Sequence, residues 1–210
     1  RDVERSRGLG DVYKRQINNK LFLNSNKTHL MILSSAKSHS NHGNFGIQLN
    51  TGNEIIEPSK VEKLLGANVT SDFQWKVHLR DHSKSVISRL KTKNNALSLI
   101  SYYSSFLIRK MIANGIIMSQ ILYHIQLYGG CSKELLDALQ VQQNRAARLV
   151  CPRPWRTSTK VLFQEIGWMT VKQLMVHHSI LSLYKTRKAG VPKYVHEIIS
   201  VPFIQQTRLA

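Results

Sequence analysis

The sequence carries few of the side chains that enzymes commonly use for chemistry. Its 210 residues include 12 Asp and Glu and only two Cys. No two acids after residue 16 are adjacent, so the sequence lacks the paired carboxylates of a two-metal polymerase or nuclease centre. It also lacks a phosphate-binding GxxxxGK[ST] loop and a GxSxG nucleophile elbow. These residues predict no self-contained catalytic centre.

Histidines and cysteines give no metal-binding spacing either. His177 and His178 are adjacent on an expected helix with no third ligand nearby, and His39 and His42 lie in a polar loop. We expect solvated or packed histidines. Two cysteines, Cys131 and Cys151, are too few for a disulfide framework or a four-ligand zinc site. They favour a reducing compartment, and we expect ordinary half-buried thiols.

Basic residues dominate instead. Thirty Lys and Arg against 12 acids give a net charge of +18 and a pI near 10.2. Between Asp81 and Glu134 there is no acid, but there are Lys84, Arg89, Lys91, Lys93, Arg109, Lys110 and Lys133. The cations of such a segment repel one another unless a polyanion is near. Because they are spread out and form no short motif, they suit contacts with phosphates rather than sequence-specific contacts with bases. Nucleic acid is therefore the expected partner; the alternative is a merely soluble basic surface.

Before Asp72, the order of apolar and polar residues predicts strands. Apolar and polar residues alternate over Phe45–Leu49, and Glu54–Glu57 can return as a second strand that Pro58 ends. Residues 63–69 can form another strand or hairpin, with Gly66 and Asn68 as turn residues. We expect a small, mostly antiparallel sheet here.

After Asp72 the apolar residues recur with helical spacing. We expect helices over residues 75–90, 97–128 (with a break near 101–105), 133–150, 158–166, 170–187 and 195–200. The most apolar stretch, residues 111–127, contains five polar side chains, so we interpret it as a buried core helix and expect no membrane partner. The predicted fold class is α+β: a small antiparallel sheet followed by a mainly helical bundle.

The amino terminus has a foreign character. Asp11–Gln16 reads DVYKRQ, which resembles translated sequencing-adaptor read-through, so we interpret residues 1–16 as an assembly scar; the alternative is a basic tail. Residues 17–210 keep a charge of +16 and show no signal peptide. We expect two structured regions, residues 17–70 and residues 71–200, followed by a tail over residues 201–210. We expect an intracellular protein of cytoplasm and nucleus, not a secreted one.

Five short blocks follow one another between about residues 20 and 190. They are Asn24–Thr28 with the run to Leu33; Lys63–Ala67 with Asp72, Trp75, His78 and Leu79; Ile121–Tyr123 with Tyr128 and Gly129; Leu139, Gln140, Gln143, Ala146 and Arg148; and Phe163 with Gly167–Thr170. In order and spacing they resemble the end of the palm, the primer grip and the thumb of non-LTR (LINE-type, jockey-like) retrotransposon reverse transcriptases. Each block alone is weak, and the set is fairly specific.

The resemblance implies roles for the first two blocks. Lys27 would be the general acid that protonates the leaving pyrophosphate, although a surface lysine beside a strand fits equally well. Lys63, Leu65 and Gly66 would form the primer grip, a hairpin whose backbone seats the primer 3′ end. Gly66 would allow close backbone approach, and we favour this role over a simple turn glycine.

The resemblance implies that the helices from Trp75 form a thumb. The thumb would hold the RNA template and DNA primer as a duplex through phosphate contacts from Lys84, Arg89, Lys91 and Lys93. Arg145 and Arg148 could instead face solvent. We expect Trp75 and Trp168 to pack in the core rather than to stack on bases.

One departure from the family limits the expected activity. The fingers and the [FY]-x-D-D turn should precede Leu21, and the sequence does not contain them. We therefore expect a fragment that needs the remainder of the reverse transcriptase chain and is inactive alone. It would need no cofactor by itself, whereas the intact RNA-directed DNA polymerase would use Mg²⁺.

Two other functions remain open from the sequence. The chain could be a stand-alone basic helical nucleic-acid-binding module. It could also be a basic helical protein that binds partner proteins or an anionic membrane.

Overall fold

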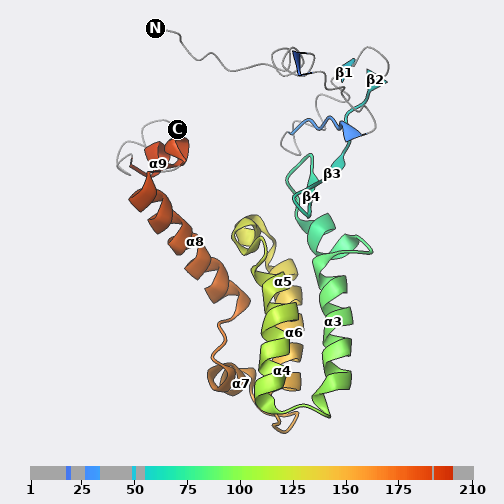
Figure 1. Ribbon diagram of the computed structural model, residues 1–210, viewed down its shortest axis with the longest axis vertical. Coiled ribbons are helices and arrows are strands. Elements are labelled where there is room, and N and C mark those ends of the chain that lie inside the picture. The colour runs from blue at the N-terminus through green and yellow to red at the C-terminus, as the bar shows by residue number, and fades with distance from the viewer. Residues whose placement is uncertain (1–17, 20–26, 34–48, 51–54, 191, 201–210) are drawn as a thin grey trace. The chain divides into compact units, whose positions relative to one another are not determined.

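The computed structural model describes residues 18–19, 27–33, 49–50, 55–190 and 192–200 (Figure 1). The chain forms two compact units, Arg1–Gln74 and Trp75–Ala210. The division falls shortly after the boundary expected at residue 70. The fold is α+β, with antiparallel strand pairs in the first unit and a helical bundle in the second, as the sequence predicts.

The first unit contains two short antiparallel ladders rather than one continuous sheet. Strand β1 (Leu49–Asn50) pairs with β2 (Ile55–Ile56), and β3 (Val61–Leu64) pairs with β4 (Ala67–Thr70). The return strand expected at residues 54–57 is thus confirmed as β2. Of the strand expected before it, residues 45–48 lie outside the described residues.

The apolar run of residues 30–33 contributes a single bridge instead of a strand. Leu30 forms a parallel bridge with Pro58, and the Ser59 amide donates to the Leu30 carbonyl at 2.8 Å. Because proline has no amide hydrogen, Pro58 cannot extend this pairing into a ladder.

A two-residue turn joins β3 to β4. Leu64 pairs with Ala67, and both intervening residues have left-handed backbones, with φ of 48° at Leu65 and 84° at Gly66. Two positive φ values mark the turn type that matches the twist of a tight hairpin. Asn68 pairs with Lys63 inside the ladder, so its expected role as a turn residue is wrong.

The second unit is helical. Its elements are η2 (Val77–Asp81), α3 (Val86–Ser101), α4 (Phe106–Ala113), η3 (Asn114–Met118), α5 (Ser119–Leu122), η4 (Ile125–Gly130), α6 (Lys133–Val150), α7 (Thr159–Ile166), α8 (Val171–Ala189) and α9 (Lys193–Ser200) (Figure 1). The expected break near residues 101–105 is confirmed between α3 and α4. The predicted bounds of α6 are also confirmed.

Local side chains set the helix ends. Ser85 and Ser132 accept a hydrogen bond from the third residue of α3 and of α6, and Thr170 forms a capping box with Gln173 at the start of α8. Gly190 ends α8 with a left-handed φ of 63°, which glycine adopts without strain.

Helices α3 and α6 run side by side in the same direction. Asn94 donates to the Gln142 carbonyl at 3.1 Å, and Arg145 donates to Asn95 at 2.9 Å. The path α4–η3–α5 returns in the opposite direction, because Arg109 at its start reaches the Leu149 carbonyl near the end of α6. Apolar side chains from all three fill the core, among them Leu90, Leu97, Ala113, Ile117, Ile121, Leu139 and Ala146.

The stretch over residues 111–127 is amphipathic rather than wholly buried. Ile117 and Ile121 are fully buried, whereas Met111 is 65% exposed. Its middle, η3, is a π-helical segment between two α-helical ones. Among the described residues, no helix is long and apolar enough to cross a membrane.

Candidate nucleic-acid interface

The tip of the β3–β4 hairpin is open to solvent. Lys63 is exposed on β3, and Leu65 at the tip is 81% exposed. A left-handed backbone costs a residue other than glycine about 1–2 kcal/mol, so Leu65 occupies its position at a conformational cost. Gly66 is also exposed, and because it has no side chain the backbone at this position is open to solvent. The three predicted primer-grip residues therefore lie together at one tip.

The four cations predicted to face a duplex lie on α3 or just before it, and they divide into two pairs. Arg89 and Lys93 are four residues apart, and both are half-buried. The Lys93 ammonium donates to the Ile116 carbonyl at 2.8 Å and to the Gln120 side chain at 3.1 Å. Burial and the nearby Arg89 lower the pKa of Lys93. Lys93 is thus engaged inside the bundle.

Lys84 and Lys91 form the second pair, and both are exposed. Neither makes an ion pair with another residue in the described part of the chain. Their ammonium groups are available to an anionic partner. Lys27, in the first unit, is exposed as well, while the preceding residues 24–26 lie outside the described ranges.

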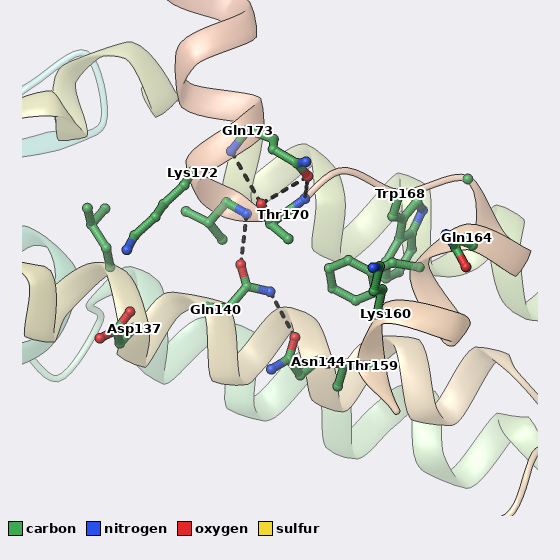
Figure 2. Close-up of a pocket in the computed structure, with 14 residues that line it drawn as sticks. Asp137, Gln140, Asn144, Thr159, Lys160, Gln164, Trp168, Thr170, Lys172 and Gln173 are labelled. Carbon is green, nitrogen blue, oxygen red and sulfur yellow. Dashed lines mark hydrogen bonds between the residues drawn. The ribbon is translucent and has the colours of Figure 1, made fainter. Parts of the chain in front are cut away.

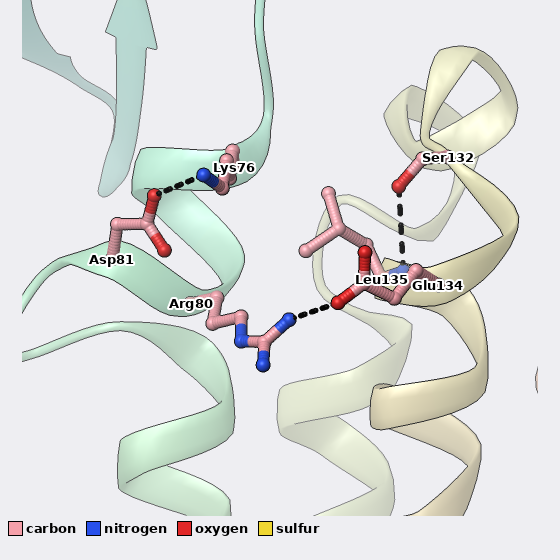
Figure 3. A network of polar contacts seen from close by, with 6 residues as sticks. All are labelled: Lys76, Arg80, Asp81, Ser132, Glu134 and Leu135. Carbon is pink, nitrogen blue, oxygen red and sulfur yellow. Dashed lines mark hydrogen bonds and ion pairs between the residues drawn. The ribbon is translucent and has the colours of Figure 1, made fainter.

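Carboxylates neutralise little of the positive charge of the second unit. Its 20 Lys and Arg face five Asp and Glu, which leaves a net charge of +15. Lys76 pairs with Asp81 at 3.2 Å, and Arg80 pairs with Glu134 (Figure 3). Arg153 pairs with Glu165 at 3.1 Å. The sequence from η2 to η4 contains no other acid than Asp81, so most of its cations have no carboxylate of their own.

Two residues of the second and third blocks meet in the core. His78 is 2% exposed, and its Nε2 lies 3.4 Å from the hydroxyl of the buried Tyr128. Burial, with His124 and Arg89 nearby, lowers the pKa of His78 to about 4. His78 is therefore neutral at pH 7 and packs inside the protein, away from any phosphate at the surface.

The last two blocks are joined by side-chain amides, of which Figure 2 shows those of Gln140 and Asn144. Gln143 is fully buried and donates to the Met169 carbonyl at 2.8 Å. Gln140 accepts from the Val171 amide at 2.8 Å and donates to Asn144 at 2.8 Å. These bonds fasten the start of α8 to α6.

A cleft of about 690 Å³ lies beside this network, between α6, α7 and the start of α8 (Figure 2). Gln140 and Asn144 line it, yet they bind one another. Trp168 also lines it, packs against the core and donates to Asn114 at 2.9 Å. Trp75 likewise packs against the core, so the expectation for both tryptophans is confirmed.

The arginines of α6 serve the fold. Arg145 holds Asn95, while Arg148 donates to the carbonyls of Trp155 at 2.6 Å and Thr157 at 3.0 Å. Both side chains are thus engaged by contacts within the chain rather than left to solvent alone.

Thiols and histidines form no ligand set in the described residues. Burial raises the pKa of Cys131 to about 11 and also raises that of Cys151, which is fully buried rather than half-buried. No three His, Cys, Asp or Glu side chains of the described ranges are placed to hold a metal ion.

Three exposed aromatic residues were missed by reasoning from the sequence: Tyr102, Tyr103 and Trp155. Each is more than 70% exposed. The signal available was the serine-flanked pair of tyrosines at the break between α3 and α4.

Comparisons of the chain with protein-family models, with curated proteins and with solved structures find no match. The resemblance to reverse transcriptases therefore rests on the sequence blocks alone.

Proposed function

We propose that the second unit binds an RNA–DNA duplex through its phosphates, as the thumb of a non-LTR retrotransposon reverse transcriptase. One observation carries this proposal: Lys84 and Lys91 are exposed without a carboxylate partner among the described residues, on a unit of net charge +15. A duplex presents about one negative charge per 1.7 Å of axis, which supplies the missing counter-charge.

The first unit has a positioning role in this proposal. The tip made by Lys63, Leu65 and Gly66 seats the primer 3′ end against exposed backbone. Lys27 serves as the general acid in the intact enzyme. In this proposal the remainder of the reverse transcriptase chain supplies the catalytic carboxylates.

Lys91 and Lys93 offer a matched test because they lie on one helix but point to different surroundings. Replacing Lys91 by Met should weaken binding and reduce the slope of log affinity against log salt by about 0.9, the value for one lost phosphate contact. Lys93→Met should leave that slope nearly unchanged and lower stability by about 1–2 kcal/mol, because it removes bonds to Ile116 and Gln120. Anisotropy titrations of a labelled RNA–DNA hybrid, with urea unfolding of both variants, measure the two effects.

The unsubstituted chain supplies the reference. Six to ten phosphate contacts predict a loss of about 10³–10⁵ in affinity between 50 and 200 mM salt. A flat response would contradict phosphate binding. Primer extension by this chain alone, with template, nucleotides and Mg²⁺, would contradict its assignment as a part that lacks the catalytic carboxylates.

A further inference from the structure

One end of the helical bundle carries a group of exposed aromatic side chains. Helices α3 and α6 run in the same direction, so the α3–α4 turn and the loop after α6 lie at the same end (Figure 1). The bond from Arg109 to the Leu149 carbonyl ties the start of α4 to that end as well. Tyr102 and Tyr103 lie in the turn, and Trp155 lies in the loop.

Each ring contacts a neighbouring side chain yet remains largely exposed. Tyr102 and Tyr103 are 86% and 87% exposed and pack edge to face, with ring centroids 5.1 Å apart. Trp155 is 73% exposed, and the Arg148 guanidinium lies 5.0 Å from its ring centroid. Arg148 also binds the Trp155 and Thr157 carbonyls, so it holds the loop as well as the indole. Ring faces held in this way are pre-organised to stack on a flat partner.

The charge around the rings selects the kind of partner. No acid occurs in the sequence of α3, α4 or the turn between them, and Arg156 is exposed in the loop that carries Trp155. Among the described residues, the acid paired near this loop is Glu165, which binds Arg153. Flat aromatic rings beside cations match unpaired bases on a phosphate backbone, because every base has a face that can stack.

We propose that this end of the bundle is a stacking platform for the unpaired bases of a single-stranded nucleic acid. Tyr102, Tyr103 and Trp155 supply the stacking faces, and Arg156 contacts phosphate. This inference rests on the proposed nucleic-acid function and adds a second substrate form to it, the single strand that continues beyond a duplex.

Three labelled probes separate the two proposals: a blunt RNA–DNA duplex, the same duplex with a single-stranded extension, and the single strand alone. Tyr102→Ala with Tyr103→Ala, and separately Trp155→Ala, should weaken binding of the extended duplex and the single strand by about 5-fold to 150-fold for each stacked base lost. Binding of the blunt duplex should not change. Tyr184→Ala, at an exposed tyrosine of α8, is the matched control and should change none of the three.

Tryptophan fluorescence gives a direct readout. A base stacked on Trp155 should quench its emission when the single strand is added, and Trp155→Phe should remove that quenching while binding persists.

The outcomes are distinguishable. Equal affinity of the tyrosine double variant and the unsubstituted chain for the extended duplex overturns the platform and leaves phosphate binding intact. Single-strand binding that is lost in the variants, together with no binding of blunt duplex, overturns the duplex proposal alone. Exposed Leu107 and Ile108 adjoin the turn. Self-association in sedimentation that the aromatic variants abolish, with nucleic-acid binding unchanged, would instead assign this end to contact between copies of the chain.

Discussion

His78, Gln143 and Arg148 belong to sequence blocks that resemble a nucleic-acid enzyme, yet each makes contacts with other residues of the chain, and the first two are buried. His78 packs against Tyr128, Gln143 binds the Met169 carbonyl, and Arg148 binds the loop after α6. Buried polar groups are costly to leave unpaired, so such residues tolerate few substitutes. A block of this kind can therefore mark a fold requirement rather than a ligand contact.

The titration of His78 predicts a pH-dependent stability. Its pKa is about 4 in the folded chain against 6.5 without burial, so the unfolded chain binds more protons between these values. The contribution of His78 to the free energy of unfolding is fully present above pH 6.5. It should fall by up to about 1.4 kcal/mol per pH unit as the pH drops toward 4. Urea unfolding across this range measures the slope.

His78→Gln should reduce this slope, because glutamine does not titrate. An unchanged slope in the His78 variant would show that other groups, such as His124, dominate.

Gln143 is the residue whose loss should disturb the α6–α8 junction most directly. Gln143→Leu leaves the Met169 carbonyl without its donor and should destabilise the chain by about 1–3 kcal/mol. Gln164→Leu, at an exposed position of α7, should change stability by no more than about 0.5 kcal/mol. Thermal unfolding of the two variants tests this, and equal losses would remove the special role of Gln143.

At the scale of elements, helix ends were predictable and side-chain directions were not. Ser132 and Thr170 are strong starting residues, and Gly190 is a strong end, so local chemistry accounts for the start of α6 and for both ends of α8. Lys91 and Lys93 are the same residue type on the same helix, and nothing local separates them. Only packing against Ile116, in a π-helical segment that the pattern does not reveal, turns Lys93 inward.

The hairpin tip combines an unfavourable residue with an exposed position. Leu65→Asn should stabilise the first unit by up to about 1 kcal/mol, because asparagine tolerates a left-handed backbone better than leucine does. If the tip seats a primer end, the same change should weaken binding of a recessed 3′ end while leaving a blunt duplex unaffected. Hydrogen exchange of the β3–β4 amides measures the first effect and anisotropy the second.

Gly66→Val is the opposing variant. Valine is strongly disfavoured at a φ of 84°, so the exchange protection of the hairpin should fall. Protection that survives this substitution would show that the turn is set by something other than its two left-handed residues.

At the scale of the whole molecule, charge opposes compactness. The second unit confines a net charge of +15 with five carboxylates to offset its cations. Salt screens such repulsion over about 10 Å at 0.1 M, so raising NaCl from about 20 to 200 mM near neutral pH should stabilise the unit by about 1 kcal/mol. Calorimetry at each concentration tests this expectation.

A polyanion should have a larger effect than salt at equal ionic strength, because it binds the folded surface. A melting temperature that falls with salt would mean that the ion pairs of Arg80 and Arg153 outweigh the repulsion among the remaining cations.

The π-helical segment also fixes the direction of the chain beyond it. Ala113, Ile117 and Ile121 are buried at strict intervals of four residues. In a regular α-helix each step of four overshoots a full turn by about 40°, so such a repeat would wind away from the core. The wider turn of η3 absorbs this overshoot. A regular α-helical path over Asn114–Met118 would instead rotate the chain after it by about 40° for each step of four residues, which would turn Ile121 away from the core. The winding of this one turn thus determines which side chains of the following segment face the core.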